Sequence, residues 1–373
     1  MDTHTVSKII KKISDVIPYT GSFVGVDIGS SSIKIVQLSM IDNDIVLETY
    51  GEISNTPYDV GQDPGKTSDA NPAIRSAELS DLLHEVDAQS RRCGVAVPLS
   101  ESFINVIDLP KRDPEQMLRL VPSEVQKFIP ISVDKLMIDW YPVKEEESSV
   151  FDVLVPNKQT EAHFQKVIVV AVNNDSAYRL GQIAKDSRLT PAFFEIEMFS
   201  AARACIHTTE TPALLLDLGA SSTKAYILNE HRVPVDARVI PVGGASLTQE
   251  IGKARSLDSL VAERVKCEHG LSAGSEVRTV IEPALAPIWT YVEQMFEEQK
   301  KRESKPIERV FLAGGGSYMP GIVELVASKL SLPVELIRAF DRTKGPIILE
   351  HALREDGPRF AVAVGLALRG LGR

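Results

Sequence analysis

Cysteine is scarce in this sequence: three residues, Cys93, Cys205 and Cys267, are spread over 373 positions. No CxxC pair occurs, so the spacing predicts neither a zinc site nor a disulfide framework, and it favours a reducing compartment. Apolar runs are short; KVIVVAVNN at 166–174 falls well below the roughly 20 residues that cross a bilayer. Residues 1–22 lack the apolar centre and cleavage site of a signal peptide. We therefore expect a soluble, cytoplasmic protein.

Basic residues are in the minority, and the formal net charge is −10. This charge argues against a general nucleic-acid-binding protein, because contact with the phosphate backbone requires a basic surface. A hydrophobic content of 43% and a charged content of 25% are those of an ordinary globular protein. A chain of 373 residues is long for a single core and suits two domains.

One short motif occurs twice. FVGVDIGSSSIKIVQL at 23–38 and LLLDLGASSTKAYIL at 214–228 each place an Asp, a Gly and serines between two apolar runs. Aligned, they share Asp27/Asp217, Gly29/Gly219, Ser31/Ser221, Ser32/Ser222, Lys34/Lys224 and Leu38/Leu228. A motif repeated 190 positions apart predicts a chain of two related halves.

Each copy reads as the tip of a β-hairpin, because residues on both sides favour strands. A P-loop would instead need GxxxxGK[ST] at the start of a helix. A Gly- and Ser-rich tip can offer N–H groups and hydroxyls to phosphate oxygens, and an adjacent Asp suits a hydrated Mg²⁺ ion. A third turn, LAGGGSYMPGI at 312–322, lets backbone pass close to a flat ligand such as adenosine. Taken singly, each turn is better explained as an ordinary tight turn; the presence of two copies favours the phosphate-binding interpretation.

Together, the two DxG hairpins and the late strand–GGG–helix resemble the phosphate and adenosine motifs of the actin-like ATPases. This resemblance implies an α/β protein of two RNase H-like domains that binds ATP and Mg²⁺ in the cleft between them. It implies cofactor contacts from these residues: Asp27, Gly29, Ser30, Ser31, Ser32, Lys34, Asp217, Gly219, Ala220, Ser221, Ser222, Gly243, Gly244, Glu263, Lys266, Gly314, Gly315 and Gly316.

Three roles follow from the same resemblance. Asp27 and Asp217 would hold Mg²⁺ through water, and Glu197, in FEIEMFSAARA, would orient the attacking water as the catalytic residue. In AERVK, Glu263 would lie near the ribose hydroxyls and Lys266 beside the adenine. A salt-bridged helix surface explains AERVK equally well. The resemblance implies ATP binding and leaves open whether ATP is hydrolysed, even weakly.

A longer stretch narrows the family. After the strand CGVAVP, residues 102–143, SFINVIDLPKRDPEQMLRLVPSEVQKFIPISVDKLMIDWYPV, resemble the inserted α+β subdomain of the PilM family of type IV pilus assembly proteins. PVGGASLTQEI and the final VAVGLALRGL are similar to that family too. The implied domains are an N-terminal helical extension at 1–21 and a first RNase H-like domain at 22–211, with the inserted subdomain at about 108–172. The second RNase H-like domain covers 212–373, with a nucleoside-contacting helical subdomain at about 243–305.

Membership of that family implies a cytoplasmic ATP-binding scaffold for pilus assembly. Its partner would be the N-terminal cytoplasmic tail of a PilN-like inner-membrane protein, and partner proteins would hold it peripherally at the inner membrane. Other pilus components and self-association are further implied contacts, and nucleic acid is not. Candidates for the peptide groove, which core packing explains equally well, are Phe103, Leu118, Val125, Phe128 and Trp140.

Two other functions stay open. The FtsA family of filament-forming actin homologues shares an inserted subdomain but usually ends in a flexible tail and a membrane-binding helix, which GLALRGLGR does not resemble. A small-molecule kinase of the same fold would need a carboxylate base, for which Glu101 is the nearest candidate. The spacing at 6–17 predicts a basic amphipathic helix, which either packs on the protein or contacts a membrane or partner.

Overall fold

The computed structural model describes residues 21–54, 71–142, 164–205, 211–302 and 305–373. The chain divides into two compact units. The smaller unit is Ser100–Ala177, and the larger one combines the residues before and after it. The helix predicted over 6–17 lies outside the described residues. Within the described ranges, no helix is both long and apolar enough to cross a membrane.

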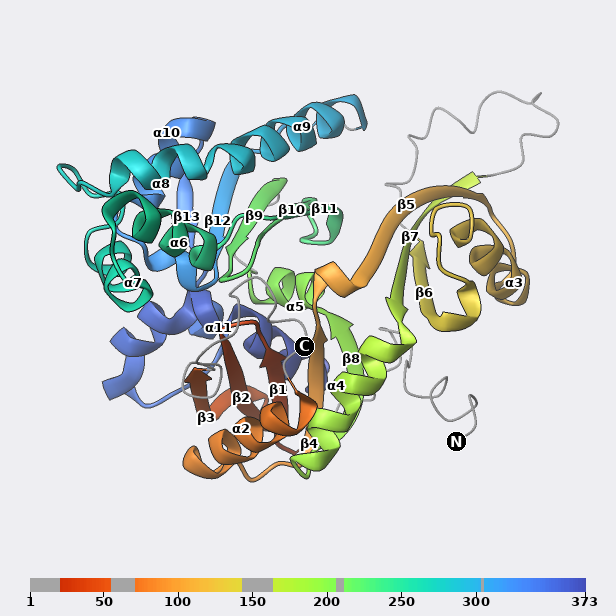
Figure 1. Cartoon of the computed structure of the whole chain (residues 1–373). Coiled ribbons are helices and arrows are strands. Elements are labelled where there is room, and N and C mark those ends of the chain that lie inside the picture. Colours follow the sequence, from red (N-terminus) through yellow and green to blue (C-terminus); the bar gives the residue numbers. More distant parts are fainter. Residues whose placement is uncertain (1–20, 55–70, 143–163, 206–210, 303–304) are drawn as a thin grey trace. The chain divides into compact units, whose positions relative to one another are not determined.

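The larger unit contains two five-stranded sheets (Figure 1). The first has the order β3-β2-β1-β4-β8. Strands β1, β2 and β3 form an antiparallel meander, and β1, β4 and β8 are parallel. Its strands are β1 (Phe23–Ile28), β2 (Ser32–Ile41), β3 (Asp44–Ser54), β4 (Arg92–Val97) and β8 (Thr190–Ile196).

The second sheet repeats this topology, with the order β11-β10-β9-β12-β13. A meander of three antiparallel strands is again followed by two parallel strands. The two halves predicted from the repeated motif are therefore present as two sheets of identical strand order. The strands are β9 (Ala213–Leu218), β10 (Thr223–Leu228), β11 (Pro234–Ile240), β12 (Arg309–Ala313) and β13 (Val334–Leu336).

Helices cover both faces of the first sheet (Figure 1). On one face, α2 (Pro72–Glu85) packs against Gly51 of β3 through Leu82 and through Val86, the residue that follows the helix. As the Asn-Pro pair predicts, Asn71 caps this helix, its side chain accepting a hydrogen bond from the Ala73 amide at 3.0 Å. The opposite face carries α11 (Glu350–Gly370) and α5 (Glu197–Ala204). A further helix, α4, spans Asn174–Asp186.

The C-terminal helix α11 packs mainly on β1 and β2 of the first sheet, although it follows the second sheet in sequence. The contact is close because glycines remove side chains from it. A Cβ atom on Gly25 would lie 1.9 Å from the Ala363 carbonyl oxygen, and one on Gly365 would lie 1.9 Å from that of Ser200. The domain boundary at 211/212 stays a prediction. Helix α11 belongs in sequence to the predicted second domain, but it packs on the sheet of the predicted first domain.

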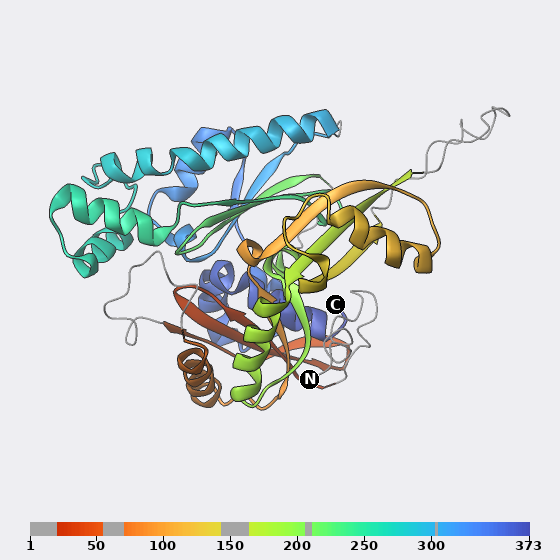
Figure 2. The same cartoon turned by 45° about the vertical axis from the view of Figure 1, so that its right-hand side comes forward.

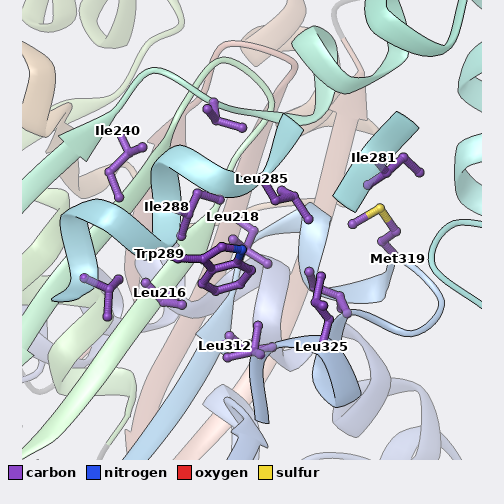
Figure 3. Packing of buried hydrophobic residues seen from close by; sticks show 14 of the residues in the cluster. Leu216, Leu218, Ile240, Ile281, Leu285, Ile288, Trp289, Leu312, Met319 and Leu325 are labelled. Atoms are coloured by element: carbon purple, nitrogen blue, oxygen red, sulfur yellow. The ribbon is translucent and has the colours of Figure 1, made fainter. Parts of the chain in front are cut away.

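The second sheet has its own core, which the helices α6 to α10 complete. In Figure 3, Trp289 of α9 points toward Leu216, Leu218 and Leu312 of the strands. In Figure 2, α9 runs along the sheet. The helices are α6 (Gly244–Arg255), α7 (Ser259–Glu268), α8 (Arg278–Ala284), α9 (Ala286–Arg302) and α10 (Ile322–Leu330).

The smaller unit contains an antiparallel sheet of order β5-β7-β6, against which the helix α3 packs. Met117, Val121 and Val125 of α3 are buried against the sheet, as the helical spacing predicts. Pro122 lies inside this helix without ending it. The elements are β5 (Ser102–Pro110), α3 (Pro114–Val125), β6 (Leu136–Pro142) and β7 (Phe164–Asn173).

Candidate functional site

The two predicted hairpins close in the same way. The Gly29 amide donates to the Ser32 carbonyl oxygen at 2.9 Å, and the Gly219 amide donates to that of Ser222 at 3.1 Å. Each tip joins the first two strands of its sheet. The equivalent residues of the repeat therefore adopt equivalent backbone structures.

Register places the Asp and the Lys of each motif directly opposite one another. Asp27 faces Lys34 across β1 and β2, and Asp217 faces Lys224 across β9 and β10. The two lysines nevertheless have different partners. Lys34 Nζ lies 3.2 Å from Glu52, whereas Lys224 Nζ lies 3.6 Å from Asp217 and also reaches a carboxylate on α5.

Glu197 is that carboxylate, buried at the N-terminus of α5. Its Oε2 accepts from Lys224 Nζ at 3.0 Å, and its Oε1 accepts from the Leu99 amide at 2.8 Å. Both oxygens are thus held, and the carboxylate faces the space between the two hairpins.

Asp27 is the carboxylate of this group that lacks a partner. In the described part of the chain, no hydrogen bond or ion pair reaches it. Burial raises the pKa of Asp27 to about 6; the Lys34 ammonium opposes this rise, and the Glu197 carboxylate adds to it. The site therefore holds negative charge that a cation would neutralise.

The N-terminus of α6 rests on the second hairpin. The Gly244 amide donates to the Gly219 carbonyl oxygen at 3.0 Å, and the Ala245 amide donates to that of Ala220 at 2.9 Å. A Cβ atom on Gly243 would lie 2.4 Å from the Ala220 oxygen, so glycine permits the contact. Gly243 and Gly244 hold the second hairpin against α6.

The three glycines of the late turn differ in their surroundings. Gly314 has a φ angle of 79°, and a Cβ atom there would lie 2.4 Å from Asp217 Oδ1. A Cβ atom on Gly316 would lie 2.8 Å from Leu218 Cβ, whereas one on Gly315 would meet nothing within 4 Å. Packing thus requires the outer two glycines, and Gly315 leaves its backbone open to the cavity.

Lys266 of α7 is buried and fully engaged. Its Nζ donates to the Gly244 carbonyl oxygen at 2.9 Å, to Thr248 Oγ1 at 2.8 Å and to Glu263 Oε2 at 2.7 Å. Burial would raise the pKa of Glu263, but hydrogen bonds from Lys266 and Thr248 outweigh it and lower the pKa. Glu263 and Lys266 thus form the ion pair that the salt-bridge interpretation of AERVK predicts. The same two residues also line the cavity.

A cavity of about 1110 Å³ brings most of the predicted residues together within the larger unit. Ser32 and Ser222 are not among its lining residues; Ser32 is buried, and its hydroxyl accepts from Lys34 Nζ at 2.5 Å. The predicted residues that line the cavity are Asp27, Gly29, Ser30, Ser31, Lys34, Glu197, Asp217, Gly219, Ala220, Ser221, Gly243, Gly244, Glu263, Lys266, Gly314, Gly315 and Gly316.

Sequence reasoning missed many residues of the cavity wall, and three of them bear on its charge and shape. Lys224 was visible as the counterpart of Lys34 in the repeat but was not assigned to the site. Tyr318 and Arg359 also line the cavity, and their guanidinium-to-ring distance is 4.6 Å. Tyr318 follows the three glycines directly, which was a local signal. No local signal marks Arg359, because it lies on α11, which is distant in sequence from the turns that form the rest of the site.

The donor set suits a magnesium–nucleotide complex better than a metal held by protein alone. Within the described residues, no group of three or more His, Cys, Asp or Glu is placed to hold a metal ion. Asp27 and Asp217 are oxygen donors at the ends of facing hairpins, and Mg²⁺ readily completes its shell with water and phosphate oxygens.

The predicted groove residues belong to the smaller unit. Val125 is 1% exposed and lies in the core, so it is not available to a partner. Leu118 and Phe128 are 63% and 51% exposed, and Phe103 and Trp140 are partly buried against the core. Glu101, the candidate kinase base, is also in this unit and does not line the cavity.

Comparison with known proteins agrees with this architecture. A solved structure described as a PilM-PilN type IV pilus biogenesis complex is similar over 95% of this chain and 99% of that chain, at 24% identity and a TM-score of 0.79. The ethanolamine utilization protein EutJ from Carboxydothermus hydrogenoformans is similar over 95% and 91%, at 16% identity and a TM-score of 0.53. A nucleotide-free diol dehydratase-reactivating factor is similar over 95% and 100%, at 13% identity and a TM-score of 0.53.

These likenesses confirm the predicted fold class, an actin-like ATPase fold of two RNase H-like domains with a small inserted α+β unit. A family model described as type IV pilus assembly protein PilM matches residues 25–371, which is nearly the whole chain. The chain therefore belongs to the PilM family of type IV pilus assembly proteins.

Proposed function

We propose that this protein binds Mg-ATP in the cavity and acts as a scaffold in type IV pilus assembly. The observation that carries the nucleotide part is the pair of equivalent hairpins, each with an Asp opposite a Lys, on the wall of one cavity of about 1110 Å³. That volume suits a ligand of nucleotide size. The open backbone at Gly315 provides room for a flat base or sugar.

Each group of residues has a separate task in this proposal. Asp27 and Asp217 hold Mg²⁺ through water, and the ion supplies charge neutralisation for the phosphates. The tips at Gly29 and Gly219 offer N–H groups and hydroxyls to phosphate oxygens. Lys224 and the Leu99 amide fix Glu197, which in this proposal would orient a water molecule.

The scaffold part rests on family membership and on the smaller unit. We propose that this unit binds the N-terminal cytoplasmic segment of a PilN-like inner-membrane protein. Its exposed apolar side chains, Leu118 and Phe128, together with Phe103 and Trp140, suit an extended peptide with apolar residues. ATP in the cavity would set the angle between the two RNase H-like halves and so the shape of the peptide groove, which would couple the two binding events.

Fluorescence anisotropy of a labelled N-terminal peptide from the PilN-like protein of the same organism tests this function. We expect saturable binding that changes in affinity when Mg-ATP is added. The double variant Leu118→Ala, Phe128→Ala should weaken binding, and because both side chains are exposed the fold should be kept. Ile347→Ala is the matched control, since Ile347 is 88% exposed in the larger unit and does not line the cavity.

Absence of peptide binding by the folded, ATP-loaded protein would contradict the scaffold function. ATP-dependent sedimentation of polymers would then favour a filament former. ATP-dependent phosphorylation of a small molecule would favour a kinase.

Mg-ATP should protect Cys267 from alkylation. This thiol is exposed and lines the cavity, whereas Cys93 and Cys205 are buried. Burial and the Glu263 carboxylate raise the pKa of the Cys267 thiol, so its thiolate fraction, and hence its labelling rate, should increase as the pH rises above 8. Intact mass spectrometry after N-ethylmaleimide treatment should show one adduct, formed at least about tenfold more slowly with saturating Mg-ATP. Equal rates with and without Mg-ATP would contradict a nucleotide at this wall.

A further inference from the structure

Glu52 extends the polar row of the first hairpin onto a third strand. It lies directly opposite Lys34 in the register of β2 and β3, just as Lys34 lies opposite Asp27 in β1. Side chains in such a row share one face of the sheet and interact across strands. Asp27, Lys34 and Glu52 therefore form a row of alternating charge across three strands, on one face of the first sheet.

The second hairpin lacks the third member of this row. Its third strand places Val239 opposite Lys224. Because the same position in the same topology accepts a valine, the fold does not require a carboxylate at Glu52. The ammonium groups differ accordingly: Lys224 turns to Glu197 and Asp217, and Lys34 is held by Glu52.

Glu52 also holds a second cation of the cavity wall. Its Oε1 lies 3.2 Å from Lys34 Nζ, and its Oε2 lies 3.3 Å from Arg359 Nη1. Lys34 and Arg359 both line the cavity, whereas Glu52 is not one of its lining residues. Two cations that face the cavity thus share one carboxylate behind them.

Arg359 lines the cavity, and Glu52 engages it through Nη1. Its guanidinium is stacked over the Tyr318 ring at 4.6 Å, which fixes its plane. Its buried Nε has no hydrogen-bond partner in the described part of the chain. Asp356 Oδ1 forms an ion pair with this nitrogen at 3.8 Å, beyond hydrogen-bond distance, and Asp356 Oδ2 accepts a hydrogen bond from Tyr50 Oη at 3.2 Å.

We propose that Lys34 and Arg359 form an anion subsite of the cavity, which takes a phosphate group of the nucleotide, and that Glu52 is the counter-ion with which this phosphate competes. The subsite deepens the proposed function and rests on it for the identity of the ligand. Arg359 supplies planar, paired donors that suit phosphate oxygens. Glu52 lowers the affinity of the subsite, since its own ion pairs must weaken when the phosphate binds.

Isothermal titration calorimetry with ATP, pyrophosphate and adenosine, each with Mg²⁺, tests the subsite. Arg359→Met should weaken ATP and pyrophosphate binding by about tenfold, and Glu52→Gln should strengthen both by about threefold. Adenosine affinity should stay unchanged in both variants. Arg359→Lys keeps the charge but loses the planar donors, so it should fall between the wild type and Arg359→Met.

Arg354→Met is the matched control, because Arg354 lies on the same helix and pairs with Glu350. Weaker or unchanged ATP binding by Glu52→Gln would overturn the competition, and equal losses of ATP and adenosine by Arg359→Met would overturn the subsite. Pyrophosphate binding that depends on Arg359, without any adenosine-nucleotide binding, would support the subsite and refute the nucleotide function. ATP binding that neither Arg359 variant affects would refute the subsite and support the nucleotide function.

Discussion

Asp27→Asn should make the ligand-free protein more stable at pH 7.5 and at the same time weaken its binding of Mg-ATP. Burial raises the pKa of Asp27 from 3.8 to about 6. Above that pH the folded protein carries an ionised carboxylate that would be better solvated in the unfolded chain. The full shift corresponds to about 3 kcal/mol, and we expect a gain of about 2 kcal/mol because the carboxylate faces the cavity.

The stability gained by Asp27→Asn should depend on pH. A carboxylate whose folded-state pKa is raised destabilises the fold progressively as the pH rises from about 4 to 6, and the loss is complete above that range. The gain from Asp27→Asn should therefore be present at pH 7.5 and absent at pH 4. Urea unfolding at the two pH values measures it, with Asp81→Asn on the exposed side of α2 as the control.

The same variant should lose affinity for Mg-ATP by about ten- to a hundredfold, because water bound to the metal loses the carboxylate that orients it. Calorimetry with and without Mg²⁺ separates this loss from a general loss of nucleotide binding. A gain in stability of the same size at both pH values, or unchanged Mg-ATP affinity, would contradict the role assigned to Asp27. Function here opposes stability, as is common in binding sites.

Gly365→Ala should cost several kcal/mol of stability or prevent folding. Its new Cβ atom would lie 1.9 Å from the Ser200 carbonyl oxygen of α5, a distance that neither backbone can relieve without moving α11. Overpacking against side chains costs about 1–3 kcal/mol, and a backbone clash exceeds this range. Gly25→Ala should behave similarly, because its Cβ atom would meet the Ala363 carbonyl oxygen.

Urea unfolding followed by circular dichroism measures this loss, and Gly315→Ala is the control. A Cβ atom on Gly315 meets nothing within 4 Å, so the unfolding midpoint of this variant should match that of the wild type. A midpoint for Gly365→Ala within experimental error of the wild type would show that α11 does not pack on α5 as described.

The sequence by itself determined the features that depend on local order. The tip of each hairpin needs a strand, a Gly- and Ser-rich turn and a second strand within a few residues, and all of these stand together in the motif. The repetition of Asp27 to Leu38 at Asp217 to Leu228 then predicted two related halves, which are two sheets of the same strand order. The Asn71 cap and the buried face of α3 followed from local spacing in the same way.

The tertiary structure decided which charges meet, because those partners are distant in sequence. Glu52 and Arg359 are 307 positions apart, and nothing in either neighbourhood indicates that α11 returns to the first sheet. The identical lysines of the repeat also looked equivalent in sequence. They differ because Lys34 faces a carboxylate on its third strand and Lys224 faces a valine, and pairing across strands is fixed only when the sheets form.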